Sequence, residues 1–129
     1  MQSFFLVMAG GAIGAGARHL TGRMLLALLG GGFPYGTLAV NLLGGVGMGL
    51  LAGWLVRAGA GAEPTRLFLG VGVLGGFTTF SSFSLDAVVL WQRGEAAVAA
   101  GYVAASVAGA IGGLVGGLAL AKMLMRTAA

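Results

Sequence analysis

The chain has 129 residues, of which 58% are hydrophobic and only 8% are charged. This balance excludes an ordinary water-soluble protein and predicts one integral membrane domain, residues 1–129, embedded in a lipid bilayer. The formal net charge is +4, but the basic residues are scattered along the chain, so we expect no nucleic-acid partner. Cysteine is absent, which excludes disulfides and thiolate metal sites.

Uncharged stretches predict four membrane crossings and hence an all-α fold. A helix rises about 1.5 Å per residue, so a hydrocarbon core about 30 Å thick needs roughly 20 apolar residues. The approximate crossings are 3–28, 35–56, 67–91 and 96–121.

Basic residues interrupt the first crossing, which is uncharged only from Ser3 to Ala17. Arg18 must therefore lie near the hydrocarbon boundary or face water inside the protein. Two interpretations of Arg18 remain open, a vestibule residue or an arginine that reaches the lipid headgroups. For His19, Arg23 and Arg57 we favour contact with headgroups.

The second crossing combines a close-packing face with a polar one. Gly45, Gly49 and Gly53 recur every four residues, which allows another helix to approach closely. Asn41 and Thr37 lie one turn apart near membrane depth. An unpaired amide in hydrocarbon costs several kcal/mol, so Asn41 should face either a partner helix or a watery pore.

The third crossing has a weak point near its middle. Gly75 and Gly76, followed by Thr78 and Thr79, lower helix propensity where freed backbone groups need partners other than water. We therefore predict a broken third helix, and the cost of such a break indicates a functional site.

Two side-chain stripes follow this weak point. One is aromatic and contains Phe77, Phe80 and Phe83; the other is hydroxylated and contains Thr78, Ser81 and Ser84. Aromatic ring edges and hydroxyl protons present positive charge without a formal charge, which suits a small anion that must be held and released. Plain helix packing is the alternative for the aromatic stripe.

Polar residues are also present in the last part of the chain. Asp86 is the only acidic residue inside a predicted crossing, so it should be paired or exposed to water. The fourth crossing carries Tyr102 and Ser106 one turn apart.

Charge does not favour either orientation. With a cytoplasmic N-terminus, four basic residues lie inside and three outside: Arg57, Arg66, Lys122 and Arg126 against Arg18, Arg23 and Arg93. This near balance permits insertion in both orientations. A four-helix chain is too small to enclose a pathway, whereas two inverted copies would bring two broken helices together at the midplane. We predict an antiparallel, dual-topology homodimer.

Three motifs together resemble the Fluc family of fluoride channels, also called CrcB proteins. They are residues 75–84 (GGFTTFSSFS), 36–44 (GTLAVNLLG) and 14–18 (GAGAR), and the resemblance extends over the whole four-helix plan. It implies a dual-topology dimeric fluoride exporter of the cell membrane with two antiparallel pores.

The same resemblance implies roles for individual residues. Phe80 and Phe83 would line each pathway with their ring edges, Asn41 would be the pore amide and Arg18 the vestibule residue. Thr37, Tyr102 and Ser106 would form a polar track, with Ser81 in the hydroxyl stripe beside the rings. Carbonyls of Gly75 and Thr78 from both subunits would enclose a structural Na⁺. Where some family members carry a further serine, this chain has Ala110.

Elementary chemistry is compatible with these roles. Fluoride holds its water tightly, so a pore must offer successive neutral donors, without a fixed lysine at the centre that would trap the ion. Sodium is a hard cation that prefers oxygen ligands, which a helix break provides as free carbonyls.

Other classes of protein remain as alternatives. A small proton-coupled multidrug exporter needs a carboxylate in the first crossing, and residues 1–17 contain none, so Asp86 would have to serve. A subunit that only assembles with partners is a further possibility. We expect no enzyme, because the sequence shows no metal-ligand cluster or nucleophile–base pair.

Overall fold

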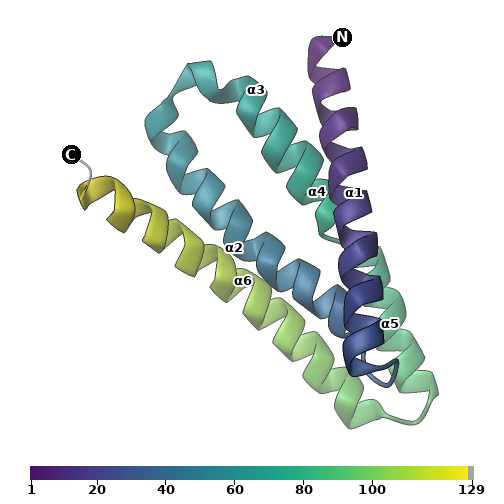
Figure 1. The fold of residues 1–129 in the computed structure, drawn as a ribbon. Coiled ribbons are helices and arrows are strands. Elements are labelled where there is room, and N and C mark those ends of the chain that lie inside the picture. Colours follow the sequence, from purple (N-terminus) through teal and green to yellow (C-terminus); the bar gives the residue numbers. More distant parts are fainter. Residues whose placement is uncertain (128–129) are drawn as a thin grey trace.

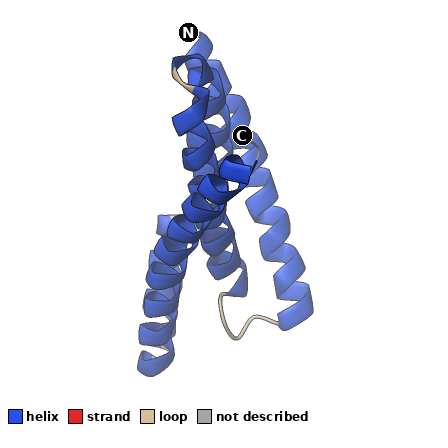
Figure 2. Cartoon of the chain, turned by 90° about the vertical axis from the view of Figure 1, so that its left-hand side faces the viewer, coloured by secondary structure: helices blue, strands red, loops and turns tan. Residues whose placement is uncertain are grey.

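The computed structural model describes residues 1–127, and helices joined by short loops make up nearly all of this part (Figure 1, Figure 2). No strand occurs among these residues. The predicted all-α class is therefore confirmed.

Three long helices and a segmented stretch account for the chain. The long helices are α1 (Gln2–Leu29), α2 (Tyr35–Ala58) and α6 (Ala96–Thr127). Between α2 and α6 lie η1 (Ala60–Ala62), α3 (Glu63–Thr65), η2 (Arg66–Leu74), α4 (Gly75–Phe77) and α5 (Phe80–Gln92). The η2 segment is a π-helix, wound more widely than its neighbours.

Three helical stretches are long and apolar enough to cross a membrane. They are Tyr35–Ala58, Ala60–Gln92 and Ala96–Arg126. Helix α1 has 28 residues and the necessary length, but it is less apolar than these three. The protein is thus multi-pass, and the crossing by α1 remains a prediction.

The helices pack as two pairs. Helix α2 lies along α6 over most of its length, and α1 lies along η2 and α4 (Figure 1). Helix α5 then contacts the first half of α6, where Phe83, Leu90, Ala99 and Tyr102 form a buried cluster. Many large apolar side chains elsewhere remain exposed, as expected of surfaces that face lipid or another chain.

Glycines bring the paired helices into backbone contact. A Cβ atom added to Gly49 on α2 would lie 2.1 Å from the carbonyl oxygen of Leu114 on α6. A Cβ atom added to Gly14 on α1 would lie 2.0 Å from the carbonyl oxygen of Val73 on η2. The close approach predicted for the glycine face of α2 is therefore confirmed. The contact of α1 with η2 and α4 also brings Arg18 next to the residues that follow α4.

We predict that Gly49→Ala destabilises the protein by about 1–3 kcal/mol, because the new methyl group overpacks the α2–α6 contact. Thermal unfolding in detergent measures this effect. Gly116→Ala on α6 is the matched control, since a Cβ there meets no atom within 4 Å. It should leave the melting temperature unchanged or raise it, and an equal loss in both variants would contradict the close-packing argument.

Candidate functional site

The backbone between α4 and α5 is extended at two consecutive residues. Thr78 has φ −83° and ψ 160°, and Thr79 has φ −155° and ψ 120°. The Thr79 hydroxyl then caps α5 by accepting from the backbone N–H of Ser82 at 3.2 Å. This local structure follows from threonine's preference for extended and N-cap positions.

Asn41 on α2 binds both backbone polar groups of Thr79. Its Nδ2 donates to the Thr79 carbonyl at 3.0 Å, and its Oδ1 accepts from the Thr79 N–H at 2.8 Å. The amide therefore has a partner on another helical segment, which was one of the two alternatives predicted for it. One Nδ2 proton remains beyond these two bonds.

Asn41 also faces a pocket of about 430 Å³ whose lining carries no charged side chain. Phe80, Phe83 and Ser106 contribute to its wall, as does Ala110, the position where some family members carry a further serine. The hydroxyl oxygen of Ser106 is buried and has no hydrogen-bond partner within residues 1–127. A buried hydroxyl without a partner is costly, so this group is available to a ligand or a water molecule in the pocket.

The aromatic side chains form a connected row. The ring centroids of Phe80 and Phe83 are 5.3 Å apart, and those of Phe83 and Tyr102 are 5.5 Å apart. Phe33 meets Tyr102 edge to face at 5.5 Å. Phe83 is buried, whereas Phe80 is 78% exposed on the single chain. The sequence did not indicate Phe33, because it belongs to a short loop and shares no periodic stripe.

A second pocket, of about 410 Å³, opens on the α1 side and is basic. It is lined by Arg18, His19 and Arg23 together with the hydroxylated residues Thr37, Thr79 and Ser82. Arg18 also donates from Nη1 to the Thr78 carbonyl at 3.3 Å. His19 and Arg23, for which the sequence favours contact with lipid headgroups, line the same pocket as Arg18.

The basic pocket and the uncharged pocket meet at Thr79, which lines both. Positive charge is therefore placed beside the uncharged wall and not within it. An anion that moved from the basic pocket past Thr79 into the uncharged pocket would meet neutral groups only.

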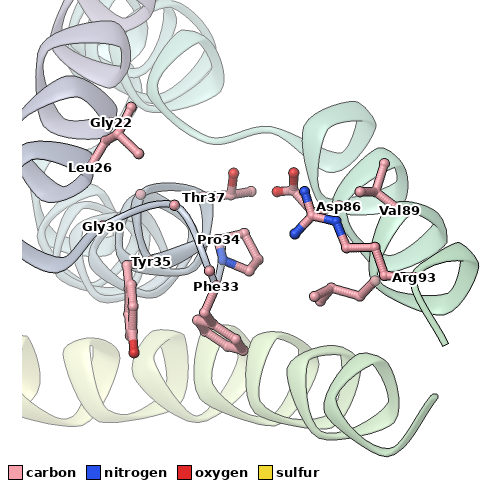
Figure 3. A pocket seen from close by; sticks show the side chains of 14 residues that line it. Gly22, Leu26, Gly30, Phe33, Pro34, Tyr35, Thr37, Asp86, Val89 and Arg93 are labelled. Atoms are coloured by element: carbon pink, nitrogen blue, oxygen red, sulfur yellow. The ribbon is translucent and has the colours of Figure 1, made fainter. Parts of the chain in front are cut away.

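Asp86 has an identifiable partner. The Tyr102 hydroxyl donates to its Oδ2 at 3.1 Å. Figure 3 shows Thr37, Asp86 and Arg93 pointing toward one another at the side of a pocket of about 350 Å³. Thr37 and Tyr102, both expected in the polar track, thus converge on one carboxylate, which the sequence alone could not pair.

The remaining candidate residues lie at the extended pair. Ser81 is exposed, and its hydroxyl is 3.2 Å from that of Thr79. Gly75 is exposed, and the N–H of Thr79, four residues later, is directed to Asn41 instead of to the Gly75 carbonyl. The carbonyl oxygens of Gly75 and Thr78 are oxygen ligands of the kind a hard cation prefers, and Thr78 retains a second lone pair beside its bond to Arg18.

Comparison with known proteins identifies relatives along most of the chain. A family model described as CrcB-like protein, Camphor Resistance (CrcB), matches residues 5–118. A Sphingopyxis alaskensis protein named Fluoride-specific ion channel FluC is 59% identical over 106 residues, which are 82% of this chain and 84% of that protein.

Two other proteins with the same name are similarly close. The one from Phenylobacterium zucineum is 60% identical over 94 residues, covering 72% of this chain and 74% of its own. The one from Mesorhizobium japonicum is 51% identical over 106 residues, covering 82% of this chain and 85% of its own. Because the family model matches residues 5–118 and these relatives are 51–60% identical, the chain belongs to the family of CrcB-like proteins.

Proposed function

We propose that this chain is a fluoride-specific ion channel that lets fluoride leave the cell passively through the cell membrane. Relatives at up to 60% identity carry that name. The structural observation that carries the proposal is the buried hydroxyl of Ser106, which has no hydrogen-bond partner among residues 1–127 and lies in an uncharged pocket beside Phe83.

The pocket chemistry fits a small anion. Ser106 has a proton to donate, Asn41 keeps one free amide proton, and the edges of Phe80 and Phe83 carry partial positive charge. These groups replace part of the ion's hydration without binding it as firmly as a buried ammonium would. The guanidinium of Arg18 lines the neighbouring basic pocket and not the uncharged one, so it attracts the anion to the entrance without forming part of the neutral wall.

The track continues toward Asp86. Tyr102 follows Phe83 in the aromatic row and bonds the Asp86 carboxylate, with Thr37 pointing at the same group (Figure 3). Ser81, next to Thr79, supplies a further hydroxyl near the entrance. We infer that fluoride exchanges neutral hydroxyl donors such as those of Ser81 and Thr37 along the way, while the Asp86 carboxylate acts only as the acceptor of the Tyr102 proton.

We further propose that α1 is the fourth crossing, that the extended pair breaks the third one, and that a second, antiparallel copy completes the site. The 78% exposure of Phe80 beside the pocket supports a partner surface there. Two copies would together present the carbonyls of Gly75 and Thr78 to a structural Na⁺, which supplies positive charge at the dimer centre. This chain contributes the two oxygen ligands and the α1 contacts that hold them.

The alternative function, a small proton-coupled multidrug exporter, is the weaker proposal. Helix α1 contains no carboxylate, and Asp86, the acid that would have to serve instead, already accepts a hydrogen bond from the Tyr102 hydroxyl.

Purified protein reconstituted in liposomes should release fluoride down its gradient and release chloride far more slowly. Ion-selective electrodes measure both fluxes in the same preparation. A lipophilic cation tested with a proton gradient provides the contrasting arm. Proton-coupled uptake of that cation, or liposomes that pass no fluoride, would contradict the channel.

Substitutions in the pocket wall should lower the fluoride flux while the protein stays folded. Each of Phe80→Ile and Phe83→Ile should lower the fluoride flux about fivefold, because each removes a ring-edge contact worth about 1 kcal/mol. Ser106→Ala should lower the flux comparably without loss of melting temperature, because the hydroxyl has no hydrogen-bond partner in the described part of the chain. Ser84→Ala is the control, since that hydroxyl donates to its own helix at Phe80 O. Unchanged flux in all three wall variants would refute the pathway.

The antiparallel dimer predicts that single cysteines near the N-terminus are labelled from both sides of the membrane. The chain has no native cysteine, so a Ser3→Cys variant gives an unambiguous signal. An impermeant maleimide should modify about half of the copies in sealed cells and the rest after lysis. Labelling of every copy from one side would exclude dual topology.

A further inference from the structure

The ends of α2 and α6 form a basic pocket that the fluoride pathway does not use. It measures about 490 Å³, and its charged lining residues are Arg57 from α2 and Lys122 and Arg126 from α6. None of its lining residues lines the uncharged pocket or the pocket of Arg18. Within the described residues, no acidic side chain contributes to its wall.

Arg57 holds this end of the helix pair together. Its guanidinium donates to the carbonyl oxygen of Met125, near the end of α6, and thereby joins the last turns of the two helices. This bond uses one of five guanidinium donors, so the others stay available to the pocket.

Lys122 and Arg126 lie one turn apart on α6, where like charges repel. Neither forms an ion pair with any residue in 1–127; the ion pair found there joins Arg66 and Glu63, outside the pocket. Three cations that line one pocket, with no counter-charge from residues 1–127, are most stable with an anion between them.

The position of the pocket indicates the source of that anion. The apolar span of α2 ends at Ala58 and that of α6 at Arg126, so the three cations stand at the ends of two spans. Trp54, half-exposed one turn before Arg57, matches an aromatic side chain at the membrane interface. Phosphate groups of phospholipids lie at this depth. Small and apolar residues such as Gly53, Val56 and Ala119 line the rest of the pocket, which suits the glycerol and first methylenes of a lipid.

We propose that this pocket binds the headgroup of an anionic phospholipid, with Lys122 and Arg126 on the phosphate and Arg57 connecting the bound lipid to the α2–α6 contact. The lipid site shares no lining residue with the proposed fluoride pathway, so an experiment can refute one proposal without refuting the other.

Native mass spectrometry of the purified protein tests the site with phosphatidylglycerol and phosphatidylcholine offered in equal amounts. The intact protein should retain phosphatidylglycerol selectively. Lys122→Gln with Arg126→Gln should weaken that binding by at least about tenfold, from the contribution expected of two basic residues at a lipid surface. The control is Arg66→Gln with Arg93→Gln, which removes the same charge elsewhere and should retain the lipid.

Two further measurements make the result decisive. The charge-preserving pair Lys122→Arg with Arg126→Lys should keep phosphatidylglycerol, which separates charge from folding. Inorganic phosphate at millimolar concentration should not displace the lipid. Displacement by phosphate would identify the ligand as free phosphate. An equal loss of lipid binding in the control pair would show only diffuse charge attraction. Either result would overturn the proposal, and so would equal binding of phosphatidylcholine.

Discussion

The two hydrogen bonds between the Asn41 side chain and the Thr79 backbone are the interaction on which the site depends. Extended backbone at membrane depth is tolerated only when its polar groups have partners, and one amide supplies a donor and an acceptor to the same residue. The bonds fix α2 against the start of α5. Because Thr79 also caps α5, they set the direction in which Phe80 and Phe83 leave the backbone.

The distribution of charge follows from the same arrangement. Glycines let α1 approach η2 and α4 at backbone distance, which brings Arg18 to the Thr78 carbonyl. The cations therefore line one pocket, while the pocket on the other side of Thr79 is lined by hydroxyl, amide, aromatic and aliphatic groups without a charge. In the proposed pathway an anion would be attracted by the first set of groups and passed along by the second, which has no full charge to retain it.

Several pairings were beyond the reach of sequence patterns. Asn41 was recognisable as a polar residue in a crossing, but its partner lies 38 positions later. Asp86 was recognisable as the one acid at depth, but Tyr102 became its donor only when α5 packed on α6. The sequence showed only the charge of His19 and Arg23 and only the loop position of Phe33. Their places in a pocket or an aromatic row could not be predicted, because several elements together form such a site.

The sequence by itself determined the class of protein, the helical segments, the glycine faces and the residue types of the site, since hydropathy, propensity and four-residue spacing are local properties of the chain. Only the tertiary structure decided which polar groups are already paired and which are free. The Asn41 side chain bonds the Thr79 backbone, whereas the Ser106 hydroxyl is buried with no hydrogen-bond partner in residues 1–127. That distinction depends on distances between residues far apart in sequence, and a linear pattern carries no such distances.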